Sequence, residues 1–352
     1  MILQRVMSGQ TALYKFGSNP DVGTSEETIW TEGGLYNWVA IDTSAGIVKI
    51  SSSSTSDGGV NQVETQTIVG TDTVSGDLQV IITSAILATS PDTLLVAIDS
   101  ADTSDEVAAK IIARLDTTTV ITDFYSVGGT DSSFTLTALT KASDDTTLNI
   151  EIAVGTSSGV TPDTTSVNTT AGVAATGALT CTIYGLSSTD STEINETITL
   201  NGQTAINSTL SYYRVNRIIC NTAGSGLVNA GVIYVGTGDV TAGVPAVKWA
   251  AVAVGNNQTL MSVYTVPINK TFYLTSFNVS TNSNKGNMVN MYHRPLGELF
   301  QIKNRSFLFS TNLRHVYEFP LMLPGGTDID CRAIGVATGA GIAFTFEGWL
   351  EI

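Results

Sequence analysis

The chain has 352 residues, of which 42% are apolar and only 13% are charged, and its formal net charge is −15. This apolar content is enough for a folded core, and the acidic excess argues against binding to nucleic acid or to an anionic membrane. Thr and Val favour strands, whereas Gly, Asn, Asp and Ser favour tight turns, and the chain is rich in both groups. We therefore expect a mainly β protein.

Residues 1–61 alternate between strand-like and turn-like segments. Trp30, Tyr36 and Trp38 precede a strand-like run at residues 47–50, and the polar stretch 51–59 ends in two glycines, as is typical of a turn.

Residues 62–173 have a different pattern, which predicts a small α+β module. Strand-like runs at 78–83 and 94–98 are followed by a helix over 102–115, because Val107, Ile111 and Leu115 share one helical face. Thr103 and Glu106 have the spacing of a capping box at the start of this helix. Further strands are expected at 134–139 and 148–153.

The strand pattern resumes at 179–184 and 194–200, and the second run ends in Asn201-Gly202, which is a strong hairpin signal. Removal of the module would bring residues 48–50 next to 179–184. We therefore predict that 62–173 is inserted into a hairpin tip of a discontinuous β domain, 1–61 plus 174–242. A linear arrangement of separate domains is the alternative.

Residues 243–352 predict a second β domain of the β-sandwich or jelly-roll type. Candidate strands at 259–266, 271–279, 307–309, 316–319 and 342–352 are separated by Gly, Asn and Pro. Eight of the 16 Lys and Arg residues lie in this last part of the chain.

The sequence contains no convincing set of catalytic or metal-binding residues. Cys181, Cys220 and Cys331 lack metal-ligand spacing and are expected to be free thiols, mostly buried. His293 and His315 are too few for most metal or triad chemistry. Paired carboxylates such as Asp328 and Asp330 are interpreted as solvated, with glycoside hydrolysis or calcium binding as remote alternatives. We expect no enzyme, no cofactor and no metal.

Three segments resemble structural proteins of marine and freshwater tailed bacteriophages. They are residues 17–34, residues 194–205 with the following 213–217, and residues 257–271. The central module is similar to one inserted in various phage virion proteins, through residues 102–115, 148–150 and 168–172.

This resemblance implies a virion structural protein, most simply a capsid decoration or cement protein on the outer surface of the head. Its partners would be the major capsid protein or other virion proteins, and a homotrimer is expected by analogy. The chain would be made in the host cytoplasm, since its N-terminus has no apolar segment of signal-peptide length. A tail or fibre component involved in host adsorption is the alternative, and a glycan-degrading enzyme is a remote one.

Aromatic and arginine side chains commonly dominate protein interfaces, which gives a candidate contact set. Its members are Trp30, Tyr36, Trp38, Arg294, Arg305 and Arg314. In the competing interpretation, the aromatic residues belong to the core and the arginines are merely solvated. The more basic C-terminal domain would face an acidic capsid surface, and the acidic remainder would point outward.

Overall fold

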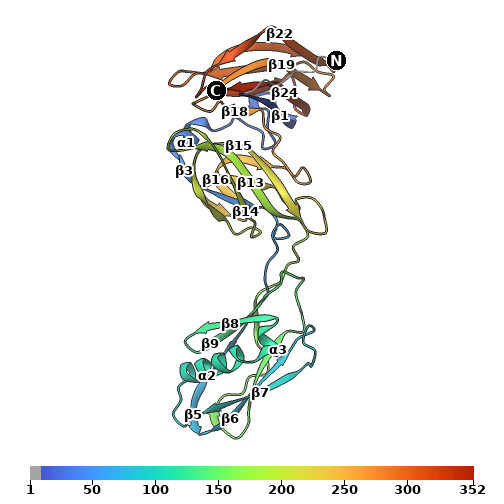
Figure 1. Cartoon of the computed structure of the whole chain (residues 1–352). Helices are drawn as coiled ribbons and strands as arrows, with labels where there is room; N and C mark the ends of the chain where they lie inside the picture. The colour runs from blue at the N-terminus through green and yellow to red at the C-terminus, as the bar shows by residue number, and fades with distance from the viewer. Residues whose placement is uncertain (1–8) are drawn as a thin grey trace. The chain divides into compact units, whose positions relative to one another are not determined.

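The computed structural model describes residues 9–352 and confirms the mainly β fold class, with β-sandwich architecture and few helices (Figure 1). Every strand pair within the described range is antiparallel. The chain divides into two compact units. Unit 1 contains the chain up to Gly58 together with Thr176–Ile352, and unit 2 is Gly59–Ala175, close to the module expected at 62–173.

Unit 2 is an α+β module with its own core. Its elements are β4 (Val63–Thr67), β5 (Gly70–Val74), β6 (Gly76–Thr83), β7 (Asp92–Ile98), α2 (Ser104–Asp116), α3 (Thr119–Thr122), β8 (Tyr125–Thr130), β9 (Ser133–Ala138), β10 (Asn149–Val154), β11 (Ser158–Val160) and β12 (Val167–Thr170). The strands form three sheets, in the orders β10-β6-β7, β12-β4-β9-β8 and β11-β5.

Helix α2 confirms the predicted helix and its cap. The Thr103 hydroxyl accepts from the Glu106 amide, and the Glu106 carboxylate accepts from the Thr103 amide at 2.9 Å. Val107, Ile111 and Leu115 are fully buried and pack in the core of unit 2. The amphipathic spacing therefore fixes which face of the helix contacts the sheets.

The first part of unit 1 is one six-stranded sheet, here called the curled sheet. Its strands are β3 (Gly46–Ser52), β13 (Ala178–Ser187), β14 (Glu193–Thr199), β15 (Ile206–Ala223), β16 (Ile233–Thr241) and β17 (Val244–Val252), in the order β14-β13-β15-β3-β16-β17. Strand β15 also contacts β17, three positions along the sheet, which requires the sheet to curl around its core.

The second part of unit 1 is a sandwich of two sheets, here called the C-terminal sandwich. Its strands are β1 (Gln10–Val22), β2 (Glu27–Thr28), β18 (Val263–Thr265), β19 (Thr271–Thr281), β20 (Asn287–Arg294), β21 (Gln301–Leu308), β22 (Asn312–Leu323), β23 (Asp328–Gly335) and β24 (Ala340–Glu351). One sheet has the order β1-β24-β19-β22, and the other has the order β18-β23-β20-β21, with β2 also pairing with β23. Phe272, Phe277, Phe344 and Phe346 lie between them.

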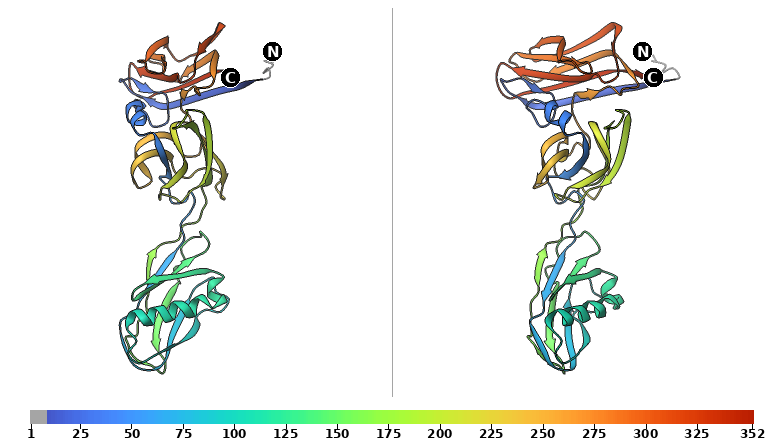
Figure 2. Two further views of the ribbon diagram at one scale, coloured as in Figure 1. Left: turned by 60° about the vertical axis from the view of Figure 1, so that its left-hand side comes forward. Right: turned by 90° about the vertical axis from the view of Figure 1, so that its left-hand side faces the viewer.

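Strand pairing in unit 1 differs from the predicted division at residues 61 and 243. Strand β1 pairs along its length with β24, so the N-terminal strand belongs to the C-terminal sandwich (Figure 2). Strand β17 lies beyond the predicted boundary but pairs with β16 in the curled sheet. Both pairings connect strands that are far apart in the chain, and a local sequence pattern does not predict which distant strand is the partner.

Two local predictions in unit 1 are wrong. Residues 1–61 were expected to alternate between strand and turn, but Trp38–Thr43 form helix α1, whose Asn37 side chain caps the Ala40 amide. Trp38 and Ile41 have the i, i+3 spacing of one buried helical face.

The Asn201-Gly202 turn forms, with Gly202 at φ +58°, but it does not close a hairpin. Strand β14 pairs with one edge of β13, and β15 pairs with the other edge. Strands β3 and β13 are likewise separated by β15, so unit 2 does not interrupt a hairpin tip. A turn sequence sets a local reversal, whereas the neighbouring strand is chosen by long-range pairing.

Asp57 organises the point at which the chain leaves unit 1. Its buried carboxylate accepts hydrogen bonds from the Ser52 hydroxyl at 2.5 Å, from the Ala178 amide at 2.7 Å and from the amides of Ala230 and Gly231 at 2.8 Å. The polar segment 51–59, predicted as a plain turn, therefore contains a buried anion that holds three separate stretches of chain together.

Candidate interaction surface

The three aromatic members of the predicted contact set lie in the core. Trp30, Tyr36 and Trp38 are buried and form consecutive edge-to-face contacts, with ring centroids 5.3 Å and 4.8 Å apart. The Tyr36 hydroxyl donates to the carbonyl oxygen of Trp249 at 2.7 Å. These side chains stabilise unit 1, and an exposed contact set that includes them does not fit the structure.

Arg294 is also committed inside unit 1. Its guanidinium lies 2.5 Å from the Asp328 carboxylate and 3.1 Å from the Asp42 carboxylate, and 5.1 Å from the centre of the Trp38 ring. Arg294 and Trp38, both in the predicted contact set, are therefore in contact. They form a cation–π pair over a buried ring and not part of an exposed surface. Neutralising Arg294 would leave the buried Asp328 with less compensation, so we expect it to lower stability and not to report on a partner contact alone.

Asp328 and Asp330, interpreted as solvated carboxylates in a turn, are instead buried in strand β23. Asp330 accepts from the Thr28 hydroxyl at 3.0 Å, the Trp38 indole at 2.9 Å and Arg332 at 2.8 Å. Burial raises the pKa of Asp330, and the nearby Arg332 charge and these hydrogen bonds oppose that shift. With their oxygens occupied by protein donors, the two carboxylates are structural groups.

A shallow hollow lies beside this charged network, with a volume of about 510 Å³. The side chains of Trp38 and Arg294 line it together with Phe300, and the exposed side chains of Val39 and Leu299 also take part in its lining. Tyr36 also lines the hollow, so the rings of Tyr36, Trp38 and Phe300 border it.

The other two arginines, Arg305 and Arg314, are exposed on β21 and β22. Within the described residues, β21 pairs only with β20 and β22 pairs only with β19, so each strand forms one edge of its sheet. The Arg305 guanidinium donates to Asn290 at 2.9 Å, and Arg314 lies 3.5 Å from Glu347 in a solvent-exposed pair. Both side chains are accessible to a partner.

The same two strands and the turn between them expose several large apolar side chains. Phe319 is 80% exposed, and the Phe307 and Phe309 rings, 5.2 Å apart, form an exposed edge-to-face pair. The apolar set consists of Phe307, Phe309, Leu313, Val316, Phe319 and Met322. Together with Arg305 and Arg314 these residues are here called the β21–β22 edge.

The irregular pairing of β22 keeps part of this edge away from its own sheet. Leu274 and Ser276 of β19 pair with Leu321 and Val316, so residues 317–320 of β22 bulge opposite a single residue. Pro320 lies in this bulge and has no amide hydrogen to donate. The sequence did place Phe307, Phe309 and Phe319 in expected strands. Strand periodicity, however, does not show which face of an edge strand is covered by other parts of the protein.

The histidine and cysteine side chains show burial and few polar contacts. Burial lowers the pKa of His293 to about 4, and neither ring nitrogen has a hydrogen-bond partner. The Sγ atoms of Cys181 and Cys220 lie 3.3 Å apart, and the three cysteines are free thiols, of which Cys181 and Cys331 are buried. Across residues 9–352, no group of three or more His, Cys, Asp or Glu side chains is placed to hold a metal ion.

No protein-family model matches the chain, and no curated protein matches its sequence significantly. None of the helices described between residues 9 and 352 is long and apolar enough to cross a membrane.

Proposed function

We propose that the chain is a bacteriophage virion structural protein that decorates or cements the outer surface of the head shell. The observation that carries this proposal is the β21–β22 edge, where exposed apolar side chains lie on strands with unpaired outer edges. Native proteins usually cover such edges, so an edge left apolar and open is suited to binding another protein.

The chemistry of the edge specifies the partner surface. Phe307, Phe309 and Phe319 supply the rigid aromatic area that dominates protein contacts, and Arg305 and Arg314 add exposed positive charge. The complementary surface would combine apolar and acidic side chains, as expected for a major capsid protein or another virion protein. If the contact is repeated around a symmetric shell, or within a homotrimer, several weak contacts together would give a stable attachment.

The resemblance of residues 17–34, 194–205 with 213–217, and 257–271 to phage structural proteins supports the same proposal. The formal net charge of −15 fits a place on the particle surface, away from packaged DNA.

The first experiment is to measure the copy number of the chain in purified particles by quantitative mass spectrometry against the major capsid protein. Copies in the hundreds support head decoration. A dozen or fewer would move the protein to the tail or a unique vertex and make host adsorption the leading function, whereas absence from particles would overturn the proposal.

The second experiment tests the edge itself by binding of purified protein to shells that lack it. Val316 on β22 and Val167 on β12 are both 62% exposed, so Val316→Ser and Val167→Ser remove equal apolar exposure from different units. We expect Val316→Ser and Phe319→Ser to weaken binding at least tenfold and Val167→Ser to leave it unchanged. An effect of Val167→Ser alone would place the contact in unit 2 instead.

A further inference from the structure

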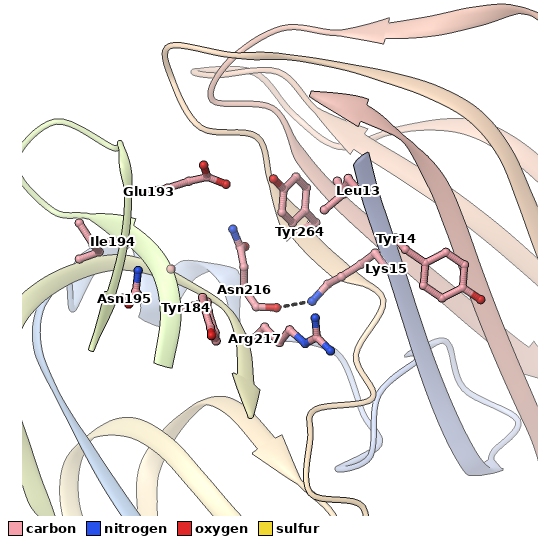
Figure 3. Close-up of a pocket in the computed structure, with 11 residues that line it drawn as sticks. Leu13, Tyr14, Lys15, Tyr184, Glu193, Ile194, Asn195, Asn216, Arg217 and Tyr264 are labelled. Carbon is pink, nitrogen blue, oxygen red and sulfur yellow. Dashed lines mark hydrogen bonds between the residues drawn. The ribbon is translucent and has the colours of Figure 1, made fainter. Parts of the chain in front are cut away.

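A small pocket in unit 1 contains two cationic side chains with no carboxylate paired to either. It has a volume of about 300 Å³ and lies between the curled sheet and the C-terminal sandwich (Figure 3). Lys15 on β1 is 6% exposed, and its ammonium donates to the carbonyl oxygen of Asn216. Arg217 on β15 donates to the Gln258 side chain at 2.7 Å. Within the described part of the chain, neither cation forms an ion pair.

Lys15 is buried without a paired carboxylate among the described residues. Burial, with a smaller contribution from the Arg217 charge, lowers the pKa of Lys15 to about 7. Buried charges in proteins are normally paired, because an isolated charge loses its hydration without compensation. An anion in the pocket would supply that compensation to both cations at once.

The other lining groups suggest what carries the anion. The hydroxyl of Tyr264 is buried and has no hydrogen-bond partner. The ring of Tyr184 is partly exposed, and the side-chain amide of Asn195 adds a further polar group to the lining. Aromatic faces together with hydroxyl and amide groups suit a ligand that has both C–H faces and hydroxyl groups.

One carboxylate of the protein also lines the pocket. Glu193 lies on the opposite side from Lys15 and Arg217, whose side chains lie next to each other in Figure 3. An ion pair with Lys270 partly neutralises it. The pocket therefore has a cationic side and a nearly neutral side, which favours a ligand that carries a single charge at one end.

We propose that this pocket binds one acidic sugar residue, with its carboxylate held by Lys15 and Arg217 and its ring lying against Tyr184. A volume near the lower end of the usual range for ligand pockets restricts the site to a single ring. The Tyr264 hydroxyl gains the hydrogen bond that it otherwise lacks. This sugar-binding activity is separate from shell attachment, because the β21–β22 edge contributes none of the lining residues.

The test is a ligand-observed NMR titration of the full chain with glucuronate, with glucose as the neutral analogue and inorganic phosphate as the plain anion. We expect glucuronate to bind in the millimolar range and glucose at least tenfold more weakly. Lys15→Met and Arg217→Gln should each weaken glucuronate binding at least tenfold, whereas Lys285→Met, in an exposed loop, should have no effect.

Tyr264→Phe provides a variant that leaves the fold intact, because the removed hydroxyl has no partner in the protein. We expect about fivefold weaker glucuronate binding with an unchanged unfolding midpoint. Glucuronate binding above pH 7 should also take up a proton, because the bound carboxylate favours charged Lys15 over its neutral form.

Three results would overturn the proposal. They are no binding of glucuronate at tens of millimolar, equal binding of glucose and glucuronate, and phosphate binding that is tighter than glucuronate binding and competitive with it. The last result would identify a general anion site rather than a sugar site. None of them bears on the copy number of the chain in particles, so the two proposals fail independently.

Discussion

Arg214 on β15 and Asp328 on β23 form a buried ion pair that joins the curled sheet to the C-terminal sandwich. The Arg214 Nε atom lies 3.3 Å from Asp328 Oδ1, and the two side chains are 2% and 5% exposed. Asp42 contacts Arg214 at 2.6 Å, so the guanidinium has carboxylates from two different segments around it. The two parts of unit 1 are therefore joined by charge as well as by apolar packing.

Arg214→Met should strongly destabilise unit 1, because it leaves the buried Asp328 and the partly exposed Asp42 with less compensation. We expect a loss of roughly 3–5 kcal/mol in the free energy of unfolding. All four tryptophans lie in unit 1, so urea unfolding followed by tryptophan fluorescence reports on this unit alone. Arg314→Met, which breaks an exposed pair, should change stability by less than about 0.5 kcal/mol. Equal midpoints for the two variants would contradict this assignment.

Asp57→Ala should also destabilise unit 1, because four donors lose their acceptor in a buried place. A loss of about 3 kcal/mol is expected from hydrogen bonds to a charged group. The same fluorescence measurement applies, with Asp239→Ala as the control at an exposed position on β16. If Asp57→Ala unfolded at the same urea concentration as the control, the buried carboxylate would not be what fixes this junction.

Lys15 should make the stability of unit 1 depend on pH. Its pKa is about 7 in the fold against 10.5 in the unfolded chain, so between these values the unfolded state binds more protons and stability rises with pH. The full effect would be roughly 5 kcal/mol as an upper limit. Lys15→Met should remove this rise.

The window for that measurement is pH 7 to about 9.5. Burial raises the pKa values of Tyr36 and Tyr264, so ionisation of these tyrosines in the unfolded chain lowers stability above pH 10. The difference in urea unfolding midpoint between the wild-type chain and Lys15→Met should be largest near pH 7, where the variant is the more stable of the two. Parallel pH profiles would contradict the depressed pKa.

Thr103→Ala should weaken the start of α2 by about 1 kcal/mol, because the Glu106 amide loses its acceptor. Amide hydrogen exchange over residues 104–110 of the full chain measures this directly, since unit 2 contains no tryptophan. Thr117→Ala at the other end of the same helix is the control, because its hydroxyl donates only to helix carbonyl groups. Equal exchange in both variants would show that the cap contributes nothing measurable.

Parts of the candidate sites follow from local sequence, and parts do not. Arg305 and Arg314 were predicted as contact residues and lie exposed on the β21–β22 edge. Trp30, Tyr36 and Trp38 were predicted alongside them. The sequence pattern of an aromatic residue before a strand is the same whether its side chain lies in the core or contacts a partner. Lys15 and Arg217 gave no signal, because they lie about two hundred positions apart in the chain.

The sequence by itself determined the mainly β fold class, the composition of unit 2 and the capped helix α2. These features depend on turn residues, on strand preferences and on helical spacing, all of which act within about a dozen neighbouring residues. Only the tertiary structure decided that β1 pairs with β24, that β15 separates β3 from β13, and that Asp328 is buried against Arg214. Sheet registers and buried ion pairs join residues far apart in the chain, and their energies depend on burial that no local pattern specifies.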